Sequence, residues 1–153
     1  MVTITKAEAD RLFNRLQLRH TVATRNDYGK VTGFRLFIEG RLRNPDNLGQ
    51  FSGKKHLGYR QYWHRRCAPA LDAALLETGW RYAPTRRKRI TLHAQTWNLY
   101  DDAGLAVALK PAEDALVRAG ILQDDGPESG HVITKTQERN RKERGIWITV
   151  ELL

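Results

Sequence analysis

The sequence predicts a single α/β domain in which a small mixed β-sheet is flanked by helices. Segments with a period of two alternate with segments of three-and-four spacing, in the order helix, strand, helix, strand, helix, strand, strand. The length of 153 residues suits one domain with a substantial core. Hydrophobic residues make up 41% and charged residues 28% of the chain, which is typical of a globular protein.

The chain begins with a predicted helix. Thr5 and Glu8 form a capping box, and an amphipathic pattern continues to about His20. Asn26 to Lys30 then give a turn signal. Packing of this helix on the core and a role in external contacts both remain open.

A strand and a long helix follow. Phe34, Leu36 and Ile38 alternate with other residues, which predicts a strand, and residues 44–49 predict a loop. Gly58 to Thr78 have helical spacing, with a kink expected at Pro69 and an end at Gly79. Three side chains fall on the apolar face of this helix and are expected in the core: Tyr62, Trp63 and Cys67.

Three further strands and one loop are expected in the second half of the chain. Residues 90–94 predict a strand that leads straight to an acidic pair, a common position for active residues in α/β proteins. Residues 131–136 and 146–152 predict two more strands. The polar run 137–145 between them predicts a hairpin loop.

A helix between two acidic pairs has two possible starts. Leu105, Leu109, Ala112, Leu116 and Ala119 lie on one face, and Gly120 is a natural stop. The helix either runs from about Gly104 with a kink at Pro111 or begins near Lys110. We favour the second start, because a helix of only ~14 Å lets the following extended run return to the helix N-terminus. With the longer helix, the two acidic pairs could meet only across a dimer interface.

Such a return path would bring the pairs Asp101-Asp102 and Asp124-Asp125 together as a metal site. Mg²⁺, or Mn²⁺ in its place, takes carboxylate oxygens, activates water and stabilises charge on phosphate. Lys110 could neutralise the charge that develops in the transition state. The alternative is that both pairs have ordinary structural roles, with Asp102 as a helix cap and Asp124-Asp125 in a turn.

The net charge of +9 is the electrostatic signature of a protein that binds a phosphate backbone. The alternative is a solvated basic surface. The candidate DNA-binding residues lie in three groups: Lys54 and Lys55; Arg86, Arg87, Lys88 and Arg89; and Arg139, Arg141, Lys142 and Arg144.

Several other classes of protein are not expected. No apolar run approaches the ~18 residues of a membrane helix, and no signal peptide is visible. The single cysteine excludes an internal disulfide and fits a cytoplasmic protein. The chain contains no P-loop or glycine-rich nucleotide motif, so no small-molecule cofactor is expected.

The segment after the first acidic pair resembles the RusA family of crossover junction endodeoxyribonucleases. The residues that carry the resemblance are Lys110, Asp114, Ala115, Leu116, Ala119, Gly120, Asp124 and Asp125. The resemblance implies a Mg²⁺-dependent, homodimeric enzyme that resolves four-way DNA junctions, encoded by a bacterium, phage or prophage. It assigns residues 31–153 to a RusA-like core and residues 1–30 to a helical addition. It makes Asp101, Lys110 and Asp125 the catalytic residues, with Asp124 beside the metal.

The chain departs from the family pattern at one place. Where the family has Asp-x-Asp-Asn-Leu, this sequence has Asp101-Asp102-Ala103-Gly104-Leu105. Asp102 is therefore expected to replace the missing carboxylate, one residue out of register. Two hypotheses follow besides the enzyme: a DNA-binding protein on the same fold that does not cut, and a basic RNA-binding or structural protein.

Overall fold

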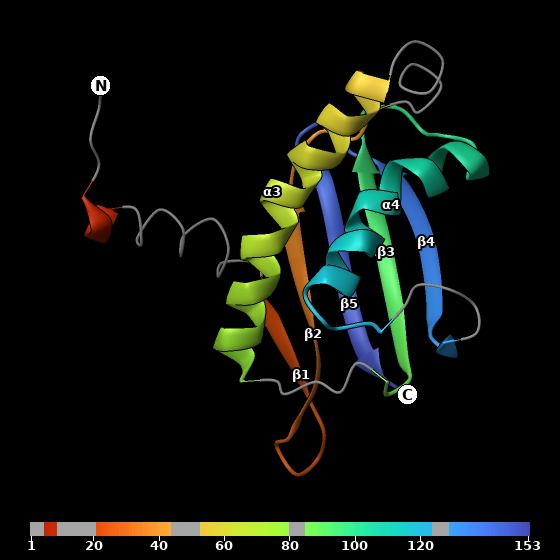
Figure 1. Ribbon diagram of the computed structural model, residues 1–153. Helices are drawn as coiled ribbons and strands as arrows, with labels where there is room; N and C mark the ends of the chain where they lie inside the picture. Colours follow the sequence, from red (N-terminus) through yellow and green to blue (C-terminus); the bar gives the residue numbers. More distant parts are fainter. Residues whose placement is uncertain (1–4, 9–20, 44–52, 80–84, 124–128) are drawn as a thin grey trace.

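The computed structural model describes residues 5–8, 21–43, 53–79, 85–123 and 129–153, with only the backbone of residues 53–56. Its described part contains a five-stranded mixed sheet and two long helices (Figure 1). The elements along the chain are β1 (Val22–Arg25), β2 (Val31–Glu39), α3 (Gly53–Thr78), β3 (Lys88–Thr96), α4 (Asp102–Arg118), β4 (Val132–Arg139) and β5 (Gly145–Leu152). The predicted α/β class is confirmed.

The strands lie in the order β1-β2-β5-β3-β4. Only β3 and β4 are parallel, and α4 is the crossover between them; the other pairs are antiparallel. Both helices cover the same face of the sheet (Figure 1). Alternate residues of the three central strands point toward them and are at most 3% exposed: Phe34, Leu36, Ile38, Ile90, Leu92, Ala94, Ile146, Ile148 and Val150.

The helices complete this core. Trp63, Cys67 and Leu71 of α3 are fully buried, as are Leu109 and Leu116 of α4. Burial also raises the pKa of the Cys67 thiol to about 12, as expected for a core cysteine. The predicted placements of Trp63 and Cys67 are confirmed, and so is the helix end before Gly79, which has a positive φ of 64°. Within the described chain, neither α3 nor any other helix has the length and apolarity of a membrane span.

The N-terminal part is less separate from the core than predicted. The Thr5–Glu8 capping box is present, since Glu8 N–H donates to Thr5 Oγ1 and Thr5 N–H donates to Glu8 Oε2. However, Val22–Arg25 form strand β1, which pairs with β2 through the predicted turn at residues 26–30. The boundary predicted at residue 30 therefore divides a β-hairpin. The rest of the predicted first helix, residues 9–20, lies outside the described residues.

The predicted hairpin between the last two strands is wrong. Residues 137–139 continue β4, and only residues 140–144 form the loop. Strand β3 lies between β4 and β5 and pairs with both. The connection therefore crosses the end of β3, where Asn140 N–H donates to Thr96 O at 2.9 Å.

The predicted start of the helix near Lys110 is also wrong. Helix α4 begins at Asp102 and continues through Pro111 to Arg118, a length of about 25 Å. Leu105, Ala108 and Leu109 are buried in its first half, so helical packing there outweighs the hydrogen bond that Pro111 cannot donate. Gly120 ends the helix as predicted, with a φ of 77°. The N–H groups of Ile121 and Leu122 then bond back to Leu116 O, so both residues stay at the helix C-terminus.

Candidate nucleic-acid interface

The first acidic pair lies where β3 ends and α4 begins. Asp101 is the N-cap residue of α4: its Oδ1 accepts the N–H of Gly104 at 2.6 Å, and its carbonyl accepts the N–H of Leu105. Asp102 is exposed in the first turn. Carboxylates stabilise a helix at this end because the helix dipole is positive there. The helix cap is therefore Asp101 and not Asp102, for which this role was predicted, and both carboxylates reach the surface.

A glutamine from β4 fixes the segment before Asp101. Gln137 Oε1 accepts the N–H of Tyr100 at 2.9 Å, and Gln137 Nε2 donates to Tyr100 O at 2.7 Å. This two-point contact ties the β3–α4 connection to the neighbouring strand. Gln137 was predicted to lie in a loop, and this role could not be predicted because the pairing joins residues 37 positions apart.

The arginine-rich loop 140–144 lies at this same end of the sheet. Asn140 binds β3 through its backbone N–H, and its side chain accepts the N–H groups of Lys142 and Glu143 at 3.0 and 2.9 Å. These bonds fold the loop into a compact turn. Arg139, Arg141 and Lys142 are exposed, and Arg144 is half-buried. The end of β4 and the loop thus bring four cationic residues to this end of the sheet.

An exposed tryptophan lies among these cations. Trp97 follows β3 directly and is 47% exposed. The guanidinium carbon of Arg141 lies 5.0 Å from the centre of its ring, and that of Arg144 lies 5.4 Å from it. A role for Trp97 could not be predicted, because no local sequence pattern connects residue 97 with residues 141 and 144.

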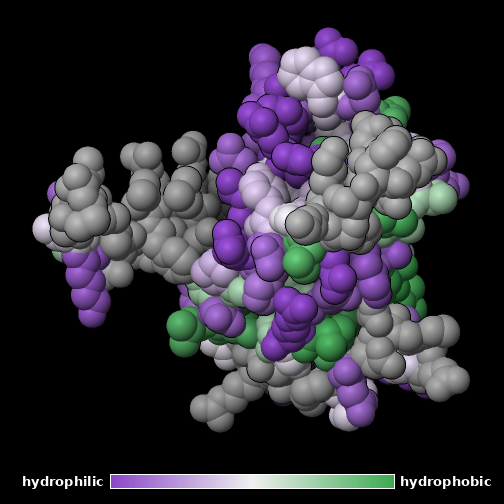
Figure 2. Space-filling view, turned by 45° about the horizontal axis from the view of Figure 1, so that its top comes forward, coloured by the Kyte–Doolittle hydropathy of each residue, from purple (hydrophilic) through white to green (hydrophobic). Residues whose placement is uncertain are grey.

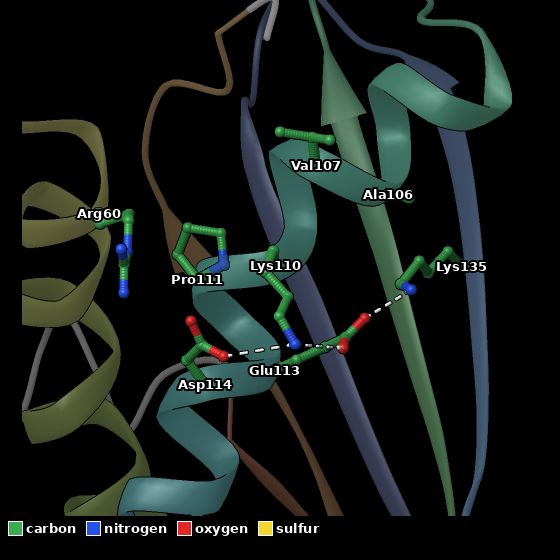
Figure 3. Close-up of a pocket in the computed structure, with 8 residues that line it drawn as sticks. All are labelled: Arg60, Ala106, Val107, Lys110, Pro111, Glu113, Asp114 and Lys135. Carbon is green, nitrogen blue, oxygen red and sulfur yellow. Dashed lines mark ion pairs between the residues drawn. The ribbon is translucent and has the colours of Figure 1, made fainter. Parts of the chain in front are cut away.

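Lys110 lies elsewhere on α4, in a charged groove of about 600 Å³ (Figure 3). Its Nζ is 3.7 Å from Glu113 and 3.6 Å from Asp114. Glu113 is buried and also contacts Lys135 of β4, with 2.5 Å between Oε1 and Nζ. Arg60 of α3 lines the opposite side of the groove. Lys110 is nine residues beyond Asp101, about 13 Å along the helix axis, so α4 does not bring the two together.

The second predicted basic group lies at the far end of β3, about 30 Å from Trp97. Arg86, Arg87 and Arg89 are exposed there. Lys88 is fully buried and donates to Arg86 O at 2.9 Å, so its prediction as a DNA contact is wrong. Burial, with a smaller effect of nearby Arg86, lowers the pKa of Lys88. The backbone at Lys54 and Lys55 is helical, and their side chains lie outside the described part of the chain.

The residues predicted to hold a metal are only partly placed. The described residues contain no group of three or more His, Cys, Asp or Glu side chains arranged to hold an ion. Asp101 and Asp102 offer two carboxylates, whereas Asp124 and Asp125 lie outside the described residues, as does the predicted meeting of the two pairs. Mg²⁺ can bind through one or two carboxylates with substrate phosphate. The described residues thus fit part of a Mg²⁺ site and do not complete it.

A polar network occupies the face of the sheet opposite the helices. Glu138 Oε1 accepts a hydrogen bond from Gln95 at 2.9 Å and lies 3.3 Å from His93 Nε2. These contacts, the Gln95 bond first, lower the pKa of Glu138. On the same face Arg35 stacks 4.1 Å from the centre of the Trp147 ring. Figure 2 shows a different side of the molecule, the helical side of Figure 1 with its top tilted forward. Hydrophilic side chains dominate there, and hydrophobic ones form only small separate patches.

Comparison with known proteins does not assign a family. No family model and no curated protein matches the chain. Among solved structures, the chain is similar to the crystal structure of a putative translation initiation inhibitor from Salmonella typhimurium, with 15% identity and a TM-score of 0.36. The match covers 87% of this chain and 97% of that chain. A likeness of this size carries no argument about function.

Proposed function

We propose that the protein binds four-way DNA junctions and cuts them as a Mg²⁺-dependent endonuclease of the RusA kind. One observation carries the proposal: the exposed carboxylates of Asp101 and Asp102 share one end of the sheet with the arginine-rich loop 140–144. Carboxylates beside a cationic surface suit hydrolysis of a polyanion, since the cations hold the backbone next to the reacting phosphate.

The binding part of the proposal depends on charge. A chain of net charge +9 attracts DNA at long range, and arginines in the loop contact phosphates without reading base sequence. Selectivity for a junction would then come from shape. A homodimer would present two such surfaces to the symmetric strands of a junction.

The cutting part depends on the acidic residues. Mg²⁺, or Mn²⁺, would supply an activated water and stabilise charge on the scissile phosphate. Asp101 and Asp102 would hold the ion, together with Asp124 and Asp125 as the RusA resemblance implies. Lys110 would serve as the cation for the transition state. Its position along α4 supports this role only if the DNA or a second subunit spans the intervening ~13 Å.

The alternative is a protein that binds junctions without cutting them. Two observations favour it: Asp101 already serves as a helix cap, and Ala103 stands where the family carries its second carboxylate. Both hypotheses share the same DNA-binding surface, so only a cleavage assay separates them.

The experiment is incubation of a labelled four-way junction with Mg²⁺ or with EDTA, followed by native and denaturing gels. The enzyme is expected to make symmetric nicks only with Mg²⁺. Asp101→Asn should abolish cutting while keeping the fold, because Asn caps a helix as well as Asp. Asp101→Ala should in addition lower the free energy of unfolding by about 0.5–2 kcal/mol.

The matched control is Asp72→Asn, which removes one exposed carboxylate from α3 and should cut normally. A junction that wild-type protein retards but leaves uncut with Mg²⁺ would establish the binding-only alternative. Equal affinity for a junction and a linear duplex would remove the selectivity from both hypotheses.

A further inference from the structure

We infer that Trp97, Arg141 and Arg144 form a clamp for DNA backbone phosphate, in which the indole ring holds the two guanidinium groups ready for binding. The inference rests on the DNA-binding part of the proposed function and adds to it a residue, Trp97, and the group that the site contacts.

The geometry of the clamp comes from two anchored segments. Trp97 is the residue after β3, and the loop that carries both arginines is bonded to Thr96 through Asn140. The ring therefore lies against the loop rather than projecting freely. With guanidinium carbons 5.0 and 5.4 Å from the ring centre, both arginines lie within cation–π distance of it.

The chemistry of stacked arginine favours phosphate as the ligand. A guanidinium that stacks on an aromatic ring keeps its N–H groups in its own plane, where they can bind two phosphate oxygens at once. Stacking also reduces the rotamer freedom that a long side chain would otherwise lose on binding. Because Trp97 is 47% exposed beside two such groups, a backbone has room to approach.

The arginines are also electrostatically available. Within the described residues, neither Arg141 nor Arg144 forms an ion pair with a carboxylate. Lys110, by contrast, lies within 4 Å of two carboxylates. The clamp therefore offers the less neutralised positive charge. Because Asp101 is only four residues beyond Trp97, a phosphate held here would lie at the acidic end of the sheet.

The test measures DNA affinity by fluorescence anisotropy in EDTA, so that no cutting occurs, between about 50 and 200 mM salt. The double variant Arg141→Gln/Arg144→Gln should weaken DNA binding about tenfold or more, since each substitution removes a charge-assisted hydrogen bond to phosphate. It should also reduce the slope of log affinity against log salt by about 1–2, because one or two phosphate contacts are lost. The matched control is Arg25→Gln/Arg118→Gln, which removes two exposed charges from residues outside the clamp.

Variants of Trp97 test the role of the ring. Trp97→Leu should weaken DNA binding, by about two- to fivefold for each arginine that loses its contact with the ring. The salt slope should stay unchanged, because both arginine charges remain. Trp97→Phe should bind within about twofold of wild type, since an aromatic face is kept. Far-UV circular dichroism melts should show that each variant remains folded.

Two results would overturn the clamp. The first is that Arg141→Gln/Arg144→Gln binds DNA no more weakly than the control Arg25→Gln/Arg118→Gln does. The second is a large loss in Trp97→Leu with an unchanged salt slope in the arginine variant, which would mean that Trp97 stacks on a base instead.

Binding to a linear duplex distinguishes failure of the clamp from failure of the proposed function. If wild-type protein binds duplex and junction equally, junction selectivity fails, yet the arginine and tryptophan effects on duplex binding would still support the clamp. If wild-type protein prefers and cuts junctions while all clamp variants match the control, the function stands and the clamp is wrong.

Discussion

At the scale of single residues, Asp101 has one task that the structure defines and one that we propose. As the N-cap it satisfies Gly104 N–H, and its removal should unravel the first turn of α4. As a proposed ligand of Mg²⁺, the same side chain would also need its negative charge. An Asn at this position keeps the first property and loses the second, so loss of stability and loss of cutting can be separated.

Glu138 gives a prediction about pH at the same scale. Hydrogen bonds from Gln95 and His93 hold its pKa below the ordinary 4.5. A carboxyl whose pKa is lowered by folding stabilises the fold above its ordinary pKa and loses that effect as the pH falls through the lowered value. Glu138→Gln should therefore be less stable than wild type above pH 4.5, and the difference should shrink below it.

Urea unfolding at several pH values measures this difference. Glu143→Gln, which removes a loop carboxylate with no such side-chain partners among the described residues, is the control. A gap between wild type and Glu138→Gln that widens in acid would contradict the prediction.

Glu113 links two elements through one buried side chain. It lies between Lys110 of its own helix and Lys135 of β4. Glu113→Gln should lower the free energy of unfolding by about 1–2 kcal/mol, less than for a fully buried pair because both lysines can regain water. Asp114→Asn, a more exposed partner of Lys110, should change it by less than about 0.5 kcal/mol. Chemical denaturation that ranks the two variants the other way would exclude this link.

At the scale of elements, burial decides where α4 begins. A proline inside a helix costs about 3 kcal/mol, whereas each buried leucine contributes about 1.5–3 kcal/mol. Leu105 and Leu109 are both buried before Pro111, and Asp101 caps their turn. Together these terms exceed the cost of Pro111, which explains why the shorter predicted helix is not formed.

Two glycines in different elements should respond oppositely to alanine. A Cβ at Gly33 of β2 would collide with the backbone oxygen of Val150 in β5, so Gly33→Ala should lower the free energy of unfolding by about 1–3 kcal/mol. Gly58 in α3 has open space around it, so Gly58→Ala should raise it by about 0.5–1 kcal/mol. Thermal melts of the two variants check the sign, and a destabilised Gly58→Ala would show that its site is more constrained.

The long elements were predictable because their own side chains carry the pattern. Phe34, Leu36 and Ile38 alternate, and they form the buried face of β2. Strand β1 was missed because it is a short edge strand whose Val22 is exposed, so no alternation marks it. The order of strands was not predictable either, since alternation says which face is buried and not which strand is the neighbour.

The candidate site also has features that could be predicted from the sequence and features that could not. The place of Asp101 at a strand end before a helix follows from local sequence, and the structure has it there. The contacts of Trp97 with Arg141 and Arg144, and of Gln137 with Tyr100, form only after distant strands pair. Lys88 was predicted as exposed because it belongs to a basic run, but a position in β3 turns it inward.

At the scale of the whole molecule, two of the predicted DNA-binding groups lie at opposite ends of β3. Arg86 and Arg87 are near the start of β3, and the loop 140–144 is near its end. A single duplex arm, held by phosphate contacts at one end, need not reach the other. A second subunit is one way for both ends to contact a branched substrate.

The proposed dimer is a prediction at this scale. Light scattering after size-exclusion chromatography should give twice the 17.6 kDa of one chain, with and without junction DNA. A mass of one chain in both conditions would contradict the two-site arrangement, although it would leave the clamp at Trp97 untouched.

The position of β5 has a consequence for how the protein is made. This strand is the last of the described elements along the chain, yet it lies third of five in the sheet and pairs with both β2 and β3. During translation, the β1–β2 hairpin and the β3–α4–β4 unit therefore have no strand to join them until residues 145–152 leave the ribosome. Until then the facing edges of β2 and β3 stay open, and a ribosome that stalls before β5 would release two half-sheets prone to pairing with other chains.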